Sequence, residues 1–225
     1  MRSVRSTCLS CLVLACTFSA IMAGCATSQA PLVVLEAKAD HEFEYSRWQK
    51  ASEYYGEIAQ RDPSNGHAQF RYGVSLMRVG EFSKAEAPLL TAHALEPRND
   101  EIVYALAEVM HQRGEDAKLF SMLRNRAHDN RSVTTWMVLV EYAQKLDDYD
   151  SALEAVRNAC SMETGDNPEP YYRAAVLLAR INQDDEAIRR LRQAYAIDPD
   201  HEQVNTLLLE YGEVPGPTLG LAPGR

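Results

Sequence analysis

Basic residues are scarce in this 225-residue chain, which holds 23 Lys+Arg against 32 Asp+Glu and has a formal net charge of −9. Arg2 and Arg5 are the only charged residues among the first 24, so the rest holds 21 bases against 32 acids. A nucleic-acid binder needs a basic face that displaces counterions, and a polybasic membrane-surface domain needs the same sign. The charge excludes both classes, while 46% hydrophobic and 24% charged residues fit a soluble folded body.

The five cysteines are unevenly placed along the chain. Cys8, Cys11 and Cys16 lie in an apolar N-terminal stretch, and Cys25 follows it directly. Only Cys160 lies in the body of the chain, so a mature protein without the N-terminal stretch has no partner for an intrachain disulfide. A single cysteine on a helix is most often a small buried hydrophobe, and we expect this role for Cys160.

Motifs of catalysis and metal binding are missing as well. The six histidines do not recur at zinc-site spacing, and His41-Glu42-Phe43-Glu44 lacks the second histidine of a metalloprotease helix. No serine stands in a Gly-x-Ser-x-Gly elbow, and no glycine-rich phosphate loop follows a strand. We therefore expect no enzymatic activity, no metal site and no cofactor.

A short apolar stretch follows the two N-terminal arginines. Its 15 residues, 8–22, carry no charge, and they are too few for a membrane span of about 20 residues. A basic start, an apolar centre and a small-residue end are typical of a secretory signal peptide. The end, Ile21-Met22-Ala23-Gly24-Cys25, resembles the lipobox of bacterial lipoproteins, with methionine in place of the usual leucine. The alternative is an ordinary signal peptide cut after Ala26 or Ala30.

The lipobox resemblance implies a lipoprotein signal peptide over 1–24, lipidation of Cys25 and a short linker over 25–31. Each buried acyl methylene contributes about 0.8 kcal/mol, and stable anchoring needs more than one acyl chain. Alanine, not aspartate, follows Cys25. By the sorting rule of bacteria with two membranes, this implies an anchor in the outer membrane that faces the periplasm.

One spacing recurs along the rest of the chain. Proline follows twelve residues after each of three alanines, in the pairs Ala51 and Pro63, Ala85 and Pro97, and Ala187 and Pro199. Ala152 has similar neighbours but no proline, and the four alanines lie 34, 67 and 35 residues apart. The long middle interval leaves room for one diverged repeat.

Apolar residues recur in phase with these alanines at helical spacing, twice in each repeat. This pattern predicts two antiparallel helices of about 12–14 residues per repeat. Gly80-Glu81 and Asp147-Asp148 mark turns inside repeats, and the prolines mark the exits, where a helix cannot continue. Helices this short are marginal alone, so each pair must bury its apolar stripe against the next pair.

These segments resemble tetratricopeptide repeats, the 34-residue helix-turn-helix units of α-solenoids. The match is strongest over Phe70–Pro97 and Tyr171–Pro199, while Leu119 replaces the signature alanine of the third repeat. The first helix holds Lys38 and Glu42 at usually apolar places and is expected to be a solvated cap. The resemblance implies an all-α solenoid over 32–211, with five antiparallel helix pairs at about 32–65, 66–99, 100–132, 133–166 and 168–201, a capping helix at 202–211 and a flexible tail at 212–225.

In tetratricopeptide arrays the first helix of each pair lines a concave groove. Helical phase assigns to that groove Phe70, Arg71, Val74, Arg78, Tyr104, Glu108, Met137, Glu141, Tyr172, Arg173 and Arg180. Aromatic rings beside arginines suit an extended peptide or a partner helix. The alternative is that the arginines only solvate the groove and the aromatics fill gaps between helices. Trp48 and Trp136 are in phase with core positions and are expected to pack.

Together the resemblances predict a non-enzymatic, lipid-anchored adaptor or scaffold of the bacterial envelope, whose groove binds an envelope or periplasmic protein or peptide. Lipoproteins of this architecture serve pilus secretin assembly, outer-membrane protein assembly or recruitment of proteases to peptidoglycan hydrolases. Size and layout favour a pilotin-like assembly role. The alternatives are a self-associating structural protein and an accessory subunit of an envelope enzyme complex. The sequence leaves the partner and the oligomeric state open.

Overall fold

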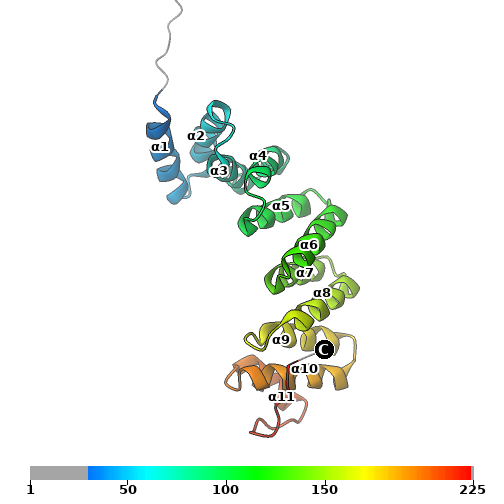
Figure 1. Ribbon diagram of the computed structural model, residues 1–225. Helices are drawn as coiled ribbons and strands as arrows, with labels where there is room; N and C mark the ends of the chain where they lie inside the picture. Colours follow the sequence, from blue (N-terminus) through cyan, green and yellow to red (C-terminus); the bar gives the residue numbers. More distant parts are fainter. Residues whose placement is uncertain (1–29, 224–225) are drawn as a thin grey trace, which may run out of the picture.

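The computed structural model describes residues 30–223, and within that range it contains eleven α-helices and no strand (Figure 1). The prediction of an all-α fold is therefore confirmed. Residues 1–29, with the signal sequence and Cys25, lie outside the described part. None of the described helices is long and apolar enough to cross a membrane. The helices are α1 (Leu32–Glu44), α2 (Trp48–Arg61), α3 (Gly66–Arg78), α4 (Phe82–Leu95), α5 (Asp100–Gln112), α6 (Asp116–Asn130), α7 (Val133–Lys145), α8 (Tyr149–Met162), α9 (Glu169–Arg180), α10 (Asp184–Ile197) and α11 (Glu202–Glu210).

The helices form five successive antiparallel pairs, α1–α2 to α9–α10, and α11 follows the last pair. Figure 1 shows the pairs following one another along an elongated array from α1 (blue) to α11 (orange). Each helix packs mainly against its neighbours in the chain. Because contacts are local, the array is a solenoid whose stability is a sum of neighbouring interfaces.

Small residues at two recurring positions let the helices of a pair approach closely. The signature position of each second helix is fully buried, whether it holds alanine or, in the third repeat, leucine: Ala51, Ala85, Leu119, Ala152 and Ala187. Twelve residues earlier the first helices bury Ala39, Gly73, Ala107, Val140 and Ala175. At Gly73 the two helices are so close that an added Cβ atom would lie 2.5 Å from Cγ of Leu89.

The turn inside each pair contains one residue with left-handed backbone geometry. Glycine supplies this geometry at Gly80 and Gly114, with φ of 84° and 71°. Ser46, Asp147 and Asn182 adopt it in the other three turns, and short polar side chains tolerate this region better than most. The turn geometry therefore recurs even where the glycine does not.

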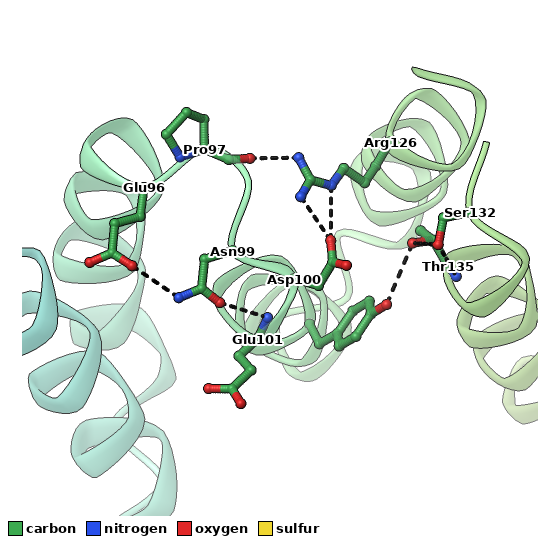
Figure 2. A network of polar contacts seen from close by, with 9 residues as sticks. Glu96, Pro97, Asn99, Asp100, Glu101, Arg126, Ser132 and Thr135 are labelled. Carbon is green, nitrogen blue, oxygen red and sulfur yellow. Dashed lines mark hydrogen bonds and ion pairs between the residues drawn. The ribbon is translucent and has the colours of Figure 1, made fainter. Parts of the chain in front are cut away.

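A polar network joins the second, third and fourth repeats around α5 (Figure 2). Arg126 of α6 donates to Oδ1 of Asp100 through Nη2 and Nε, at 2.8 and 3.1 Å, and to the carbonyl oxygen of Pro97 at 2.5 Å. Asn99 caps α5 by accepting from the backbone N–H of Glu101. The arginine thus fixes the α4–α5 turn to α6 in the repeat that lacks the signature alanine.

The chain after α11 differs from the expectation of a flexible tail over 212–225. Its described part, 212–223, folds back on α10, where Leu219 is 8% exposed. The backbone N–H of Leu221 donates to the carbonyl oxygen of Arg192 at 3.0 Å, and Nε of Arg192 donates to that of Leu219 at 2.8 Å. The segment is ordered because the burial of a leucine and the backbone hydrogen bonds offset its loss of conformational entropy, and prolines make that loss smaller.

Single residues named from the sequence are placed as follows. Cys160 is buried, and burial raises the pKa of its thiol to about 11. Trp136 is fully buried, whereas Trp48 is only half-buried and packs edge-on against Phe43. Lys38 is exposed, as expected for an end helix. The side chain of Glu42 is only 13% exposed and lies 3.4 Å from Nη1 of Arg47, so the expectation of a solvated position is wrong there.

The α3–α4 contact gives a test of the helix register. Replacing a helical glycine by alanine normally stabilises a helix by about 0.5–1 kcal/mol. Gly73→Ala should instead destabilise the protein by about 1–3 kcal/mol, because the new methyl group overlaps Leu89. Leu89→Ala alone should cost about 2–5 kcal/mol.

In the double variant Gly73→Ala/Leu89→Ala, the new methyl group enters the space that the Leu89 side chain leaves. The loss in the free energy of unfolding should therefore be clearly smaller than the sum of the two single losses. Urea unfolding of the four proteins measures this coupling. Additive costs would contradict the assigned contact.

Candidate functional site

Three adjoining hollows run along the first helices of the last two pairs and α11. Their volumes are about 440, 640 and 660 Å³. The first two share Glu141, Glu169 and Arg173, and the last two share four residues, among them Tyr172 and Arg180. We call this continuous depression the α7–α9–α11 groove.

Five of the eleven residues assigned to a groove from the sequence line this one: Met137, Glu141, Tyr172, Arg173 and Arg180. They come from α7 and α9, so helical phase placed both first helices with the correct face inward. The other six candidates lie farther toward the N-terminus and contact neighbouring helices.

The four candidates on α3 pack against the protein itself. The guanidinium of Arg71 lies 4.1 Å from the ring centroid of Phe43, and that of Arg78 lies 5.8 Å from the Trp48 ring. Phe70 and Val74 are half-buried against the core formed by α3, α4 and α5. For these residues, the interpretation of arginines and aromatics as intramolecular packing describes the structure better than a binding role.

Tyr104 and Glu108 connect α5 to α7. Glu108 accepts hydrogen bonds from the Tyr142 hydroxyl and from Nε2 of Gln112, each at 2.9 Å. The hydroxyl of Tyr104 lies 3.5 Å from Oγ1 of Thr135. Both side chains therefore form polar contacts between the third and the fourth repeat.

The hydrogen bond between Glu108 and Tyr142 shifts the pKa of both side chains. Burial alone would raise the pKa of Glu108, but hydrogen bonds from Gln112 and Tyr142, with Lys145 nearby, bring this pKa below its usual value. Burial, followed by the hydrogen bond to Glu108, raises the pKa of Tyr142. The carboxylate and the neutral phenol thus stabilise each other near neutral pH.

The bases of the α7–α9–α11 groove are each held by the chain itself. Nζ of Lys145 lies 3.0 Å from Oε1 of Glu141, and Nε of Arg173 lies 2.6 Å from Oε1 of Glu169. Nη1 of Arg180 donates to the hydroxyl of Tyr149 on α8 at 3.2 Å. These contacts keep the cations on the walls of the groove.

Helix α11 supplies groove residues that the sequence reasoning missed, because it treated 202–211 only as a cap. Glu202, Gln203, Thr206, Leu207 and Glu210 line the third hollow. The 34-residue repeat spacing does contain a signal for these groove residues. The residues 34 positions before Gln203, Thr206, Leu207 and Glu210 also line the groove: Glu169, Tyr172, Arg173 and Val176. Helix α11 therefore presents the groove face of a first helix.

The arrangement suits binding through side-chain insertion and charge. Apolar groups of Tyr172, Val176 and Leu207 lie beside charged groups, as in sites that hold extended segments. Across residues 30–223, no group of three or more His, Cys, Asp or Glu side chains is placed to hold a metal ion. His111 Nδ1 lies 3.1 Å from Asp116 Oδ1 at the α5–α6 turn, away from the groove.

Comparisons with known proteins agree with this architecture. The family model described as Tetratricopeptide repeat matches residues 36–94 and 137–202. A crystal structure of MamA protein superposes with a TM-score of 0.58 at 17% identity, covering 83% of this chain and 98% of that one. MamA from Desulfovibrio magneticus RS-1 also gives 0.58, at 11% identity, with 76% and 97% covered.

A third similar structure is YrrB, described as "a TPR protein with an unusual peptide-binding site". Its TM-score is 0.54 at 16% identity, and the match covers 79% of this chain and 91% of that one. No curated protein matches this chain in sequence. At these identities the solved structures are evidence of the fold alone.

The Glu108–Tyr142 hydrogen bond predicts a pH-dependent stability difference. Tyr142→Phe should lower the free energy of unfolding by about 1 kcal/mol near pH 7, because an ionised acceptor loses a donor. The lowered pKa of Glu108 contributes stability above the pKa of an unfolded glutamate, and this contribution is lost as pH falls through the folded value. The deficit of the variant should therefore shrink in acid.

Urea unfolding at about pH 7 and about pH 3 measures this difference. Tyr104→Phe is the matched control, since its hydroxyl faces the neutral Thr135. Its small effect should not vary with pH. An equal deficit of Tyr142→Phe at both pH values would refute the assignment.

Proposed function

Because the chain belongs to the tetratricopeptide repeat family, we propose that it is a non-enzymatic adaptor or scaffold that binds an extended protein segment in the α7–α9–α11 groove. The observation that carries this proposal is the continuity of the three hollows along α7, α9 and α11. Equivalent faces of these three alternate helices line them, so one segment can contact two repeats and the capping helix at once.

The lining supports a protein ligand. Tyr172 and Val176 occur where the second and third hollows meet, so an apolar side chain placed there contacts both. Glutamine and arginine side chains beside them provide donors for a backbone in extended form. A peptide-binding site is also named for YrrB, whose fold is similar.

We further propose that Cys25 carries the lipid anchor, after removal of 1–24, and holds the protein at the outer membrane facing the periplasm. Six residues, 26–31, would lie between the anchored Cys25 and Leu32 at the start of α1, a reach of at most about 25 Å. A protein bound in the groove would then be concentrated near the membrane surface. An envelope-assembly role, pilotin-like in its layout, fits a short tether with one binding groove.

A pull-down from solubilised membranes tests the groove. Tyr172→Ala/Arg173→Ala should lose the partners captured by the wild-type chain, because both side chains line the groove. Phe70→Ala/Arg71→Ala is the matched control, since these residues lie at equivalent positions three repeats earlier and pack within the protein. It should retain the partners. Retention by the first variant together with loss by the second would place binding elsewhere.

The anchor has its own test. Cys25→Ser removes the thiol that accepts the lipid, so the product should remain unprocessed or appear in the soluble fraction. Membrane fractionation and acyl-chain labelling measure the two outcomes. Normal membrane attachment with the label retained would show that Cys25 is not the lipidation site.

A further inference from the structure

The third hollow, between α9 and α11, joins an apolar lining to an unequal set of charges. Tyr172, Val176 and Leu207 contribute apolar surface to its volume of about 660 Å³. Arg180 lies on its α9 side, and Glu202 and Glu210 lie on its α11 side. Two carboxylates therefore share this hollow with one base.

The base is engaged and the acids are free. Arg180 donates to the Tyr149 hydroxyl, and its guanidinium lies 6.0 Å from the centroid of that ring, on α8. Among residues 30–223, no ion pair or hydrogen bond engages the side-chain carboxylate of Glu202 or Glu210. Because the Tyr149 hydroxyl is neutral, Arg180 keeps its positive charge, and two carboxylates against one guanidinium leave the hollow with one net negative charge toward an occupant.

The position of Glu210 adds to this argument. It is the last residue of α11, where exposed carbonyl groups give a helix its partial negative charge. A carboxylate there is unfavourable for the helix, and a cation supplied from outside relieves it. Glu202, in the first turn, is favoured by the same dipole, so Glu210 gains more from a basic ligand.

We propose that the segment bound in this groove carries a bulky apolar side chain flanked by lysine or arginine. The apolar side chain enters between Tyr172, Val176 and Leu207, and the flanking cation meets the carboxylates of α11. This inference rests on the proposed function and adds the chemistry of the ligand to it. The excess of acids over bases in the whole chain favours the same basic partner at long range.

Three short acetylated and amidated probe peptides test the inference, identical except for a central Lys-Leu-Lys, Glu-Leu-Glu or Lys-Ser-Lys. Fluorescence anisotropy measures the dissociation constant of each peptide with the purified full chain. Lys-Leu-Lys should bind more tightly than both others. Glu202→Gln/Glu210→Gln should weaken its binding by about fivefold, the loss expected for two exposed ion pairs.

A matched variant separates local from overall charge. Glu44→Gln/Glu53→Gln makes the same change in net charge at exposed positions on α1 and α2, and it should leave the affinity for Lys-Leu-Lys nearly unchanged. Equal weakening by both double variants would overturn the proposal, and so would equal or tighter binding of Glu-Leu-Glu or an absence of Lys-Leu-Lys binding.

The same probes distinguish this inference from the groove itself. Should Glu-Leu-Glu bind best and lose its affinity in Tyr172→Ala/Arg173→Ala, the groove is the binding site and the ligand chemistry proposed here is wrong. Should that variant bind every probe like wild type, the binding function of the groove fails as well.

Discussion

Close contact between the two helices of each pair is the constraint on which the solenoid depends. The helices are short, from 9 to 15 residues, and helices of this length gain their stability from packing rather than propensity. Small residues on both sides make that packing possible, and at Gly73 even one methyl group has no room. Because every pair also packs on the next, a change in one interface alters the direction of everything beyond it, including the groove between α7 and α11.

The third repeat shows how the array continues where the pattern weakens. Helix α5 contributes Ile102 and Leu106 to the core on its N-terminal side and Val103 and Ala107 to the core on the other side. It therefore belongs to two separate apolar clusters, as α3 does with Ala68 and Leu76. Polar contacts add to this junction. Arg126 holds the start of α5 to α6 (Figure 2), and Glu108 accepts a hydrogen bond from the Tyr142 hydroxyl of α7. Directional hydrogen bonds fix the junction where the small-residue contact has diverged.

The repeat spacing was enough to predict the helices, their pairing and the inward faces of α7 and α9, because the period and the buried positions are both local properties of the sequence. It was not enough for the segment after α11. Leu219 is buried where its segment contacts α10, and the repeat period contains no signal for this contact. Nor did it predict that the face of α3 is filled while that of α9 is open, since this depends on side-chain contacts that differ between equivalent positions.

Arg71 and Arg173 occupy equivalent positions and show what decides this. Four residues before Arg173 stands Glu169, which holds the guanidinium on α9 itself. Four residues before Arg71 stands His67, so this arginine has no carboxylate one turn back and lies over Phe43 of the preceding pair. The residue equivalent to Phe43 in the fourth repeat is Gln144, which offers no ring and lines the second hollow. Two substitutions between equivalent positions thus account for a filled face at α3 and an open one at α9. At this one position, the open surface at α9 therefore depends on a local charge pair that keeps a long side chain on its own helix.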